Sequence, residues 1–387
     1  MSTLTVNSKR SWITVGWLTI FLVGTDLFVV SPFLPAIGRD FGRMPEEVTI
    51  LVSVFGVTYA IFCPLQARLA ERIGMRKVLL GGVLGIGVAN ILTGLSFTFP
   101  AILGSRIMAG FAAASVTPMV YALAAERSPP QQRASCIALV GSGLVIALVL
   151  GAPLGFVLGS FSGWRVVFGI LGATFILIYP FNSMTWEAPQ ATPSHAKVAP
   201  TREDMAKAVP LLACMVLWAG SVYATYTLLG SALETEYGLP AGGVAVALAS
   251  FGLGAVLGGI SGGQIADRIG SLPMIRLSFL LTACAYALLA WTFEMRNLGI
   301  VCANLFSLSL FAYGFFPSLQ ALAAARFSTH RASVLGLISS SLYVGITLGS
   351  FLAGRIFGHY QMQGVVVFSC CTAGAGVLLS LGMRRDG

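Results

Sequence analysis

Two charged residues, Asp26 and Arg106, stand apart from every other charge in this sequence because they fall inside long apolar stretches. The other charged residues lie in predicted loops or at predicted helix ends. If such stretches cross a membrane, a carboxylate at mid-depth costs roughly 2.5–3.5 kcal/mol to insert and is functional by default. Burial favours the neutral form of a carboxyl group, which suits a group that takes up and releases a proton. We therefore predict that Asp26 is a proton-coupling residue, about 21 Å along its helix from Trp12.

Arg106 has two alternative interpretations. Small residues follow it on the same helical face, at Ala109, Gly110 and Ala113, and allow another helix or a ligand to approach. Arg106 also begins only about 8 Å from the end of its helix, so its side chain can extend to the lipid headgroups instead. The sequence alone does not decide whether Arg106 reaches Asp26.

Composition indicates which elements must position these residues. Of 387 residues, 56% are hydrophobic and only 10% are charged, whereas soluble domains have about 25% charged residues. Apolar runs near the ~20 residues that cross a ~30 Å hydrocarbon core recur along the chain, without the alternation of a β-barrel. We predict an all-α membrane protein with twelve transmembrane helices and no enzymatic centre. The predicted spans are 12–36, 47–67, 78–97, 101–124, 135–158, 165–185, 209–232, 243–265, 274–292, 298–321, 333–354 and 364–383.

The basic residues predict the orientation. With the N-terminus inside, 17 of the 23 Lys and Arg residues fall in cytoplasmic segments, as the positive-inside rule requires. Both termini are then cytoplasmic, and the expected location is a bacterial inner membrane. This bias explains the net charge of +9 without nucleic acid, and anionic lipid at the cytoplasmic face is the expected partner.

An internal repeat divides the chain into two six-helix halves. PMVYALAAERSPPQQRAS at 118–135 matches PSLQALAAARFSTHRAS at 317–333, and ARLAERIG at 67–74 matches GQIADRIG at 263–270. Such repeats are typical of transporters whose two bundles rock around a central site. We predict an N-terminal bundle at 1–185, a cytoplasmic linker at 186–207 and a C-terminal bundle at 208–387.

Several of these motifs resemble the major facilitator superfamily, and within it the drug:proton antiporter branch that includes sugar-efflux and chloramphenicol-exporter-like members. The motifs are AERIGMRK with its weaker copy ADRIGSLP, LGSRIMAG, GLVIALVLGAPLGFVLG followed by GWRVVF, and Asp26 before SPFLPAI. The resemblance covers the whole chain. It implies that Asp26 carries the coupled proton, that Arg106 tunes it, and that the protein is a monomer.

The fifth predicted span carries Gly151, Pro153 and Gly155. The resemblance implies that this Gly- and Pro-rich run is a conformational element and a signature of exporters. The alternative is close helix packing through small residues.

The loops after the second span of each half form a candidate gate. The resemblance implies a charge latch there, although Ala67, Glu71 and Met75 depart from the family pattern. A solvated basic turn is the alternative. The predicted gating residues are Glu71, Arg72, Gly74, Arg76, Lys77, Asp267 and Arg268.

Aromatic residues inside the spans are candidates for substrate binding, although such residues also form cores and interfacial belts. They are Tyr59, Phe111, Trp218, Tyr223, Tyr226, Phe311, Tyr313 and Tyr343. Those in the seventh span are the strongest candidates because they are clustered.

These features favour a proton-coupled exporter of small amphipathic compounds, with the small molecule and protons as its ligands. No pattern calls for a cofactor, a metal or ATP. A nutrient importer, a lysolipid or lipid flippase and a membrane receptor are the alternatives. A receptor does not need an intramembrane coupling carboxylate, which disfavours it.

Overall fold

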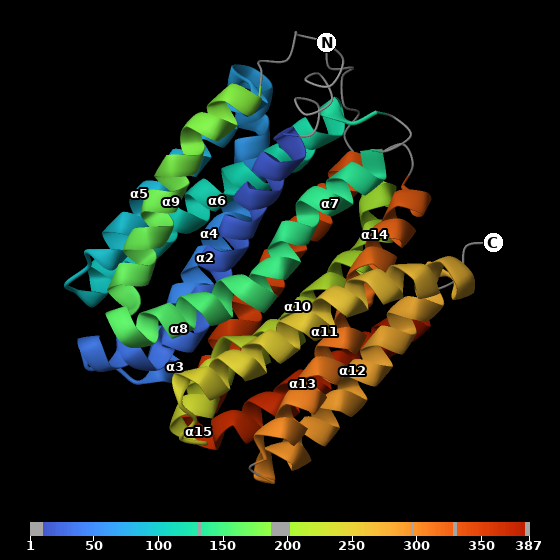
Figure 1. Ribbon diagram of the computed structural model, residues 1–387. Helices are drawn as coiled ribbons and strands as arrows, with labels where there is room; N and C mark the ends of the chain where they lie inside the picture. Colours follow the sequence, from blue (N-terminus) through green and yellow to red (C-terminus); the bar gives the residue numbers. More distant parts are fainter. Residues whose placement is uncertain (1–10, 130–132, 187–201, 296, 328–330, 384–387) are drawn as a thin grey trace, which may run out of the picture. The chain divides into compact units, whose positions relative to one another are not determined.

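The computed structural model describes residues 11–129, 133–186, 202–295, 297–327 and 331–383, and all their regular elements are helices (Figure 1). They are α2 (Ser11–Phe41), α3 (Pro45–Val48), α4 (Ile50–Ile73), α5 (Met75–Gly94), α6 (Phe99–Arg127), α7 (Arg133–Ile146), the π-helix η2 (Ala147–Gly151), α8 (Ala152–Ser162), α9 (Trp164–Thr185), α10 (Arg202–Thr235), α11 (Ala241–Ile269), α12 (Ser271–Glu294), α13 (Leu298–Tyr313), α14 (Phe315–Arg326) and α15 (Arg331–Gly382).

Within the described residues, eleven helical segments are long and apolar enough to cross a membrane. The prediction of an all-helical membrane protein is confirmed, whereas the count of twelve spans stays a prediction. The difference lies in α15, whose 52 residues would extend about 78 Å as one helix, more than twice the hydrocarbon thickness. Gln361 interrupts it with φ 56° and ψ −162°.

The chain divides into two compact units. Unit 1 comprises Met1–Val29 and Val57–Pro193, and unit 2 comprises Val30–Gly56 and Ser194–Gly387. Residues 30–56, which contain the end of α2, all of α3 and the start of α4, therefore pack with the C-terminal helices. Most of the predicted linker lies outside the described residues, and α10 begins within it, at Arg202.

In unit 1, glycines bring helix backbones close together. A Cβ on Gly87 of α5 would lie 3.2 Å from the carbonyl oxygen of Gly172 on α9, and a Cβ on Gly172 would lie 2.7 Å from that of Gly87. The α5 helix packs on both α6 and α9 (Figure 1). Small residues are typical of such contacts in membranes, where helices associate by close packing.

In unit 2, glycines also allow close packing, here of α11 on α13. Gly254, Gly258 and Gly262 are spaced four residues apart on α11 and lie on one of its faces. A Cβ on Gly254 or Gly258 would overlap the α13 backbone, and one on Gly262 would overlap Gly314. The α10 helix packs extensively on α15.

Six described residues have positive φ, and they form three pairs separated by 196 to 198 positions. Gly42 pairs with Gly238, Gly74 with Gly270, and Gly163 with Gln361. Gly74 and Gly270 share nearly the same backbone, with φ 97° and 94° and ψ 139° and 152°, and each begins the helix that follows. The sequence repeat thus recurs in the backbone conformation of the turns.

Candidate functional site

Asp26 and Arg106 meet in the interior of unit 1. Nη1 of Arg106 on α6 donates a hydrogen bond to Oδ1 of Asp26 on α2 at 2.8 Å. Their side chains are 1% and 0% exposed respectively. Arg106 therefore points inward to Asp26 and does not extend to the end of its helix.

This pair contains the only buried charges among the described side chains. The guanidinium carbon of Arg106 also lies 5.8 Å from the centroid of the Phe168 ring on α9. The second carboxylate oxygen of Asp26, Oδ2, is buried and accepts no hydrogen bond from the described residues. A buried ion pair with an unsatisfied acceptor is a costly arrangement, which is typical of functional sites.

The fifth span positions the part of α2 that carries Asp26. Along α2, Trp17, Phe21, Thr25 and Val29 form one row, and the glycines of the fifth span pack against it. A Cβ on Gly143 would lie 2.5 Å from the Trp17 carbonyl oxygen, one on Gly151 would overlap the Thr25 hydroxyl, and one on Gly155 would lie 2.6 Å from Cγ2 of Val29. These glycines fix the position of α2 around Asp26.

The same span contains the π-helix η2, and Pro153 follows it in the first turn of α8. Proline has no N–H and its ring crowds the carbonyl one turn earlier, so a widened turn relieves the clash. Single π-turns inside helices frequently occur at functional sites. Here the π-turn ends at Gly151, against the residue that precedes Asp26.

Unit 2 brings together four of the predicted aromatic residues. Trp218 lies 5.3 Å from Tyr313 and 6.3 Å from Tyr223, and Tyr223 lies 6.5 Å from Tyr226, between ring centroids. The Trp218 indole N–H donates to the Ala312 carbonyl at 2.7 Å. We refer to Trp218, Tyr223, Tyr226 and Tyr313 as the aromatic cluster.

Three members of this neighbourhood were missed from the sequence. Phe251 lies 5.3 Å from Tyr226, Phe315 stacks on Trp218 at 5.4 Å, and Phe316 lies 6.1 Å from Trp218, between ring centroids. Phe315 could have been found from the sequence because Gly314 separates it from Tyr313. Tyr313 ends α13, and Phe315 begins α14.

The other four predicted aromatic residues lie elsewhere in their units. Tyr59 and Tyr343 are buried, in unit 1 and unit 2 respectively, and Phe311 is partly exposed. Phe111 is 43% exposed and packs edge-on against Phe62 at 4.9 Å.

Hydroxyl groups supply the polar contacts around the cluster. Thr225 pairs with Ser369 and Thr227 with Ser350, each at 2.9 Å. The Tyr286 hydroxyl donates to the Ser221 carbonyl at 2.9 Å. Among the described residues of unit 2, no charged side chain is buried.

Residues 30–56 are held to α10 and α15 within unit 2. The Ser31 hydroxyl lies 2.6 Å from the carbonyl oxygens of both Tyr226 and Thr227. A Cβ on Gly230 would lie 2.7 Å from Cα of Pro32, and one on Gly354 would lie 2.6 Å from the Glu46 carbonyl. These close approaches form what we call the 30–56 seam.

Charged groups lie at the end of this seam. Arg39 pairs with Glu234 at 3.2 Å. Oε1 of Glu236 accepts the Met362 backbone N–H at 3.0 Å. Burial raises the pKa of Glu236 above its ordinary value, and the hydrogen bond from Met362 opposes this shift.

The predicted gating loops have matching structures. Nη2 of Arg76 donates to the carbonyl of Ser183, near the end of α9, at 2.7 Å. Arg276 donates to the carbonyls of Ser380 and Met383, around the end of α15, at 3.1 and 2.8 Å. Each arginine satisfies helix-terminal carbonyls that have no partner within the helix.

The remaining predicted gating residues stay a prediction. Arg72, Lys77, Asp267 and Arg268 are exposed. Glu71 lies in the last turn of α4, and its side chain is outside the described part of the chain.

The described residues define a multi-pass helical membrane protein with a buried ion pair, and sequence comparison identifies the family. The family model of the Major Facilitator Superfamily matches residues 16–295 and 211–386. The chain belongs to this superfamily and is a membrane transporter.

Two relatives from Bacillus subtilis (strain 168) support this assignment. The MFS-type transporter YceJ is 28% identical over 366 residues, covering 92% of both chains. The MFS-type transporter YtbD is 26% identical over 350 residues, covering 88% of this chain and 86% of its own.

Solved structures share the fold. A bacterial homologue of the human lysosomal transporter Spinster, in an inward-facing and unoccupied conformation, superposes with a TM-score of 0.77 at 19% identity, covering 97% of each chain. The human organic anion transporter MFSD10 (TETRAN) superposes with a TM-score of 0.72 at 16% identity, covering 96% of this chain and 99% of that one.

Proposed function

We propose that this protein is a proton-coupled secondary transporter of a bacterial inner membrane that exports small amphipathic compounds by alternating access. The buried pair of Asp26 and Arg106 carries the proposal. The only described hydrogen bond to the Asp26 carboxylate comes from a cation. Protonation of Asp26 therefore changes this contact directly. A proton on Asp26 removes the negative charge and leaves Arg106 without its anionic partner.

The proposed cycle follows from this change of charge. A proton from outside neutralises Asp26 and loosens the contact between α2 and α6, and substrate leaves outward. Return of the protein to the inward-facing state restores the ion pair and releases the proton inside. The membrane potential contributes about 2.3 kcal/mol per 100 mV for each net charge moved.

Alternating access requires two comparable halves, which we propose are 1–185 and 208–387. The three pairs of positive-φ residues and the matching roles of Arg76 and Arg276 support them. Gln361 corresponds to Gly163, the turn before α9, so we take α15 as two spans and the total as twelve. Both termini are then cytoplasmic.

The proposed substrate is a flat, amphipathic molecule. Rings of the aromatic cluster offer stacking surfaces, and the surrounding hydroxyl groups offer hydrogen bonds. Unit 2 contributes no buried charge from its described residues, so the class we favour is uncharged or weakly cationic.

The test measures proton release by purified protein when substrate is added, across lipophilic cations, phenicols, sugars, nucleosides and lysolipids. We expect a compound to displace protons from the wild type and not from Asp26→Asn, which keeps the size of the side chain. Glu234→Gln is the matched control, because it removes a carboxylate of the Arg39 ion pair and should leave proton release intact.

Substrate-dependent proton release that persists in Asp26→Asn would refute the assignment of Asp26. Transport in proteoliposomes with an imposed pH gradient separates export from import by the direction of flux. Activity restricted to lysolipids would favour the flippase alternative.

A further inference from the structure

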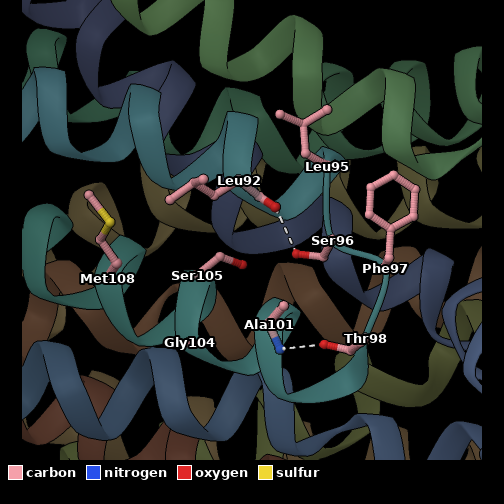
Figure 2. A pocket seen from close by; sticks show the side chains of 9 residues that line it. All are labelled: Leu92, Leu95, Ser96, Phe97, Thr98, Ala101, Gly104, Ser105 and Met108. Carbon is pink, nitrogen blue, oxygen red and sulfur yellow. Dashed lines mark hydrogen bonds between the residues drawn. The ribbon is translucent and has the colours of Figure 1, made fainter.

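A pocket of about 530 Å³ lies in unit 1 where α5 turns into α6. Figure 2 shows Leu92 and Leu95 on one side and Ser105 and Met108 on the other, with Phe97 at the edge. Leu95 and Phe97 are 61% and 83% exposed. In a membrane protein, apolar side chains exposed at the end of two spans face lipid.

The polar groups of the pocket are all uncharged and lie along part of its wall. Ser96 and Thr98 belong to the turn itself, and Ser105 lines the pocket from α6. No acidic residue lines the pocket. An occupant with a long apolar part and a polar end matches this distribution.

A positive charge lies beside the turn. Nη2 of Arg165, the second residue of α9, lies 3.4 Å from the carbonyl oxygen of Ser96, and its guanidinium stacks on Trp164 at 4.3 Å. The α9 helix begins beside the end of α5, since a Cβ on Gly94 would lie 2.6 Å from the Arg165 carbonyl. Gly163 precedes α9 and offers no side chain to cap its first N–H groups. A cation and the start of a helix together favour an anionic group.

From this geometry we infer that the pocket binds one anionic phospholipid of the surrounding leaflet. An acyl chain occupies the space between Leu92 and Met108, and the phosphate lies at Arg165 and the start of α9. The site is separate from the proposed lipid contacts of the cytoplasmic face, because the turn at 95–98 lies at the external end in the proposed orientation.

The pocket lies next to Arg106 in the sequence. Ser105 lines the pocket, bonds to Thr93 at 2.8 Å and immediately precedes Arg106. A bound acyl chain would therefore support the turn of α6 that carries Arg106. The lipid becomes a structural component of the unit that holds Asp26.

The test is native mass spectrometry of the purified full-length protein titrated with dioleoyl phosphatidylglycerol or dioleoyl phosphatidylcholine. Gly104 lines the pocket, and a Cβ there would meet no atom within 4 Å, so Gly104→Leu fills the pocket without a backbone clash. Gly81→Leu is the matched control, because Gly81 is an exposed glycine of α5 that also has open space around it.

We expect the wild type and Gly81→Leu to retain one phosphatidylglycerol that Gly104→Leu binds at least tenfold more weakly. Arg165→Gln should bind both lipids with similar affinity. A phosphatidylglycerol carrying a photoreactive group on its acyl chain should label a peptide containing residues 92–108.

Equal lipid retention by Gly104→Leu and the wild type, equal affinity of the wild type for both lipids, or labelling confined to other peptides would overturn the inference. The measurement needs no transport substrate, so its outcome does not depend on whether the proposed function is correct.

Discussion

The two units place their polar groups differently. Unit 1 buries one ion pair, Asp26 with Arg106, whereas the buried polar groups described in unit 2 are hydroxyls, an amide and aromatic rings without charge. A buried carboxylate loses its charge when it binds one proton, whereas hydroxyl groups and aromatic rings do not change charge near neutral pH. In the proposed function, unit 1 supplies proton coupling and unit 2 supplies recognition.

The largest expected effect comes from breaking the ion pair. Arg106→Met leaves Asp26 buried without its cation, and we expect the free energy of unfolding to fall by about 3–5 kcal/mol with loss of transport. Denaturant unfolding in detergent measures the first and proteoliposome flux the second. The double variant Asp26→Leu with Arg106→Met should recover stability but not transport. A loss below about 1 kcal/mol in the single variant would show that the pair is not maintained in solution.

The next effect concerns the packing that holds α2. Gly151→Val would place a branched side chain against Thr25, and we expect this overpacking to lower the free energy of unfolding by about 1–3 kcal/mol. Thermal unfolding in detergent measures it. Gly169→Val is the control, since a Cβ there meets no atom within 4 Å. Equal losses in the two variants would contradict the close contact between the fifth span and α2.

A substitution in the aromatic cluster should separate recognition from coupling. Trp218→Phe removes the N–H that donates to the Ala312 carbonyl, and we expect the free energy of unfolding to fall by about 1–2 kcal/mol. Substrate affinity should fall, whereas the pH dependence of transport should not change. Trp291→Phe is the control because Trp291 is exposed on α12. A shifted pH profile in Trp218→Phe but not in Trp291→Phe would contradict the assignment of coupling to unit 1 and recognition to unit 2.

The smallest effect is expected at the end of the 30–56 seam. The side chain of Arg39 is 70% exposed and that of Glu234 is 27% exposed, so a double-mutant cycle of Arg39→Gln and Glu234→Gln should give a coupling of about 0.2–1 kcal/mol. Added salt should weaken it further. Thermal unfolding at low and high salt provides the measurement. A large, salt-independent coupling would mean that the seam depends on this pair more than on its backbone contacts.

The sequence determined the class of this protein and the location of its elements. Composition and apolar run length predicted an all-helical membrane protein, and each described helix falls on a predicted span or beside one. The match between 67–74 and 263–270 identified a repeat that recurs in the turns at Gly74 and Gly270. These features could be predicted because helix formation in lipid depends on local composition and length.

Which side chains meet could not be predicted from the sequence and is seen in the folded structure. Asp26 and Arg106 are 80 positions apart, and the helical neighbours of Asp26 gave no sign of its partner. Ser31 lies on the first predicted span, yet it contacts carbonyls of α10 and groups with unit 2. Such contacts depend on how rigid helices pack through small residues and on which conformation the transporter adopts. Neither is encoded in the periodicity of one segment, because long-range packing is a property of several helices at once.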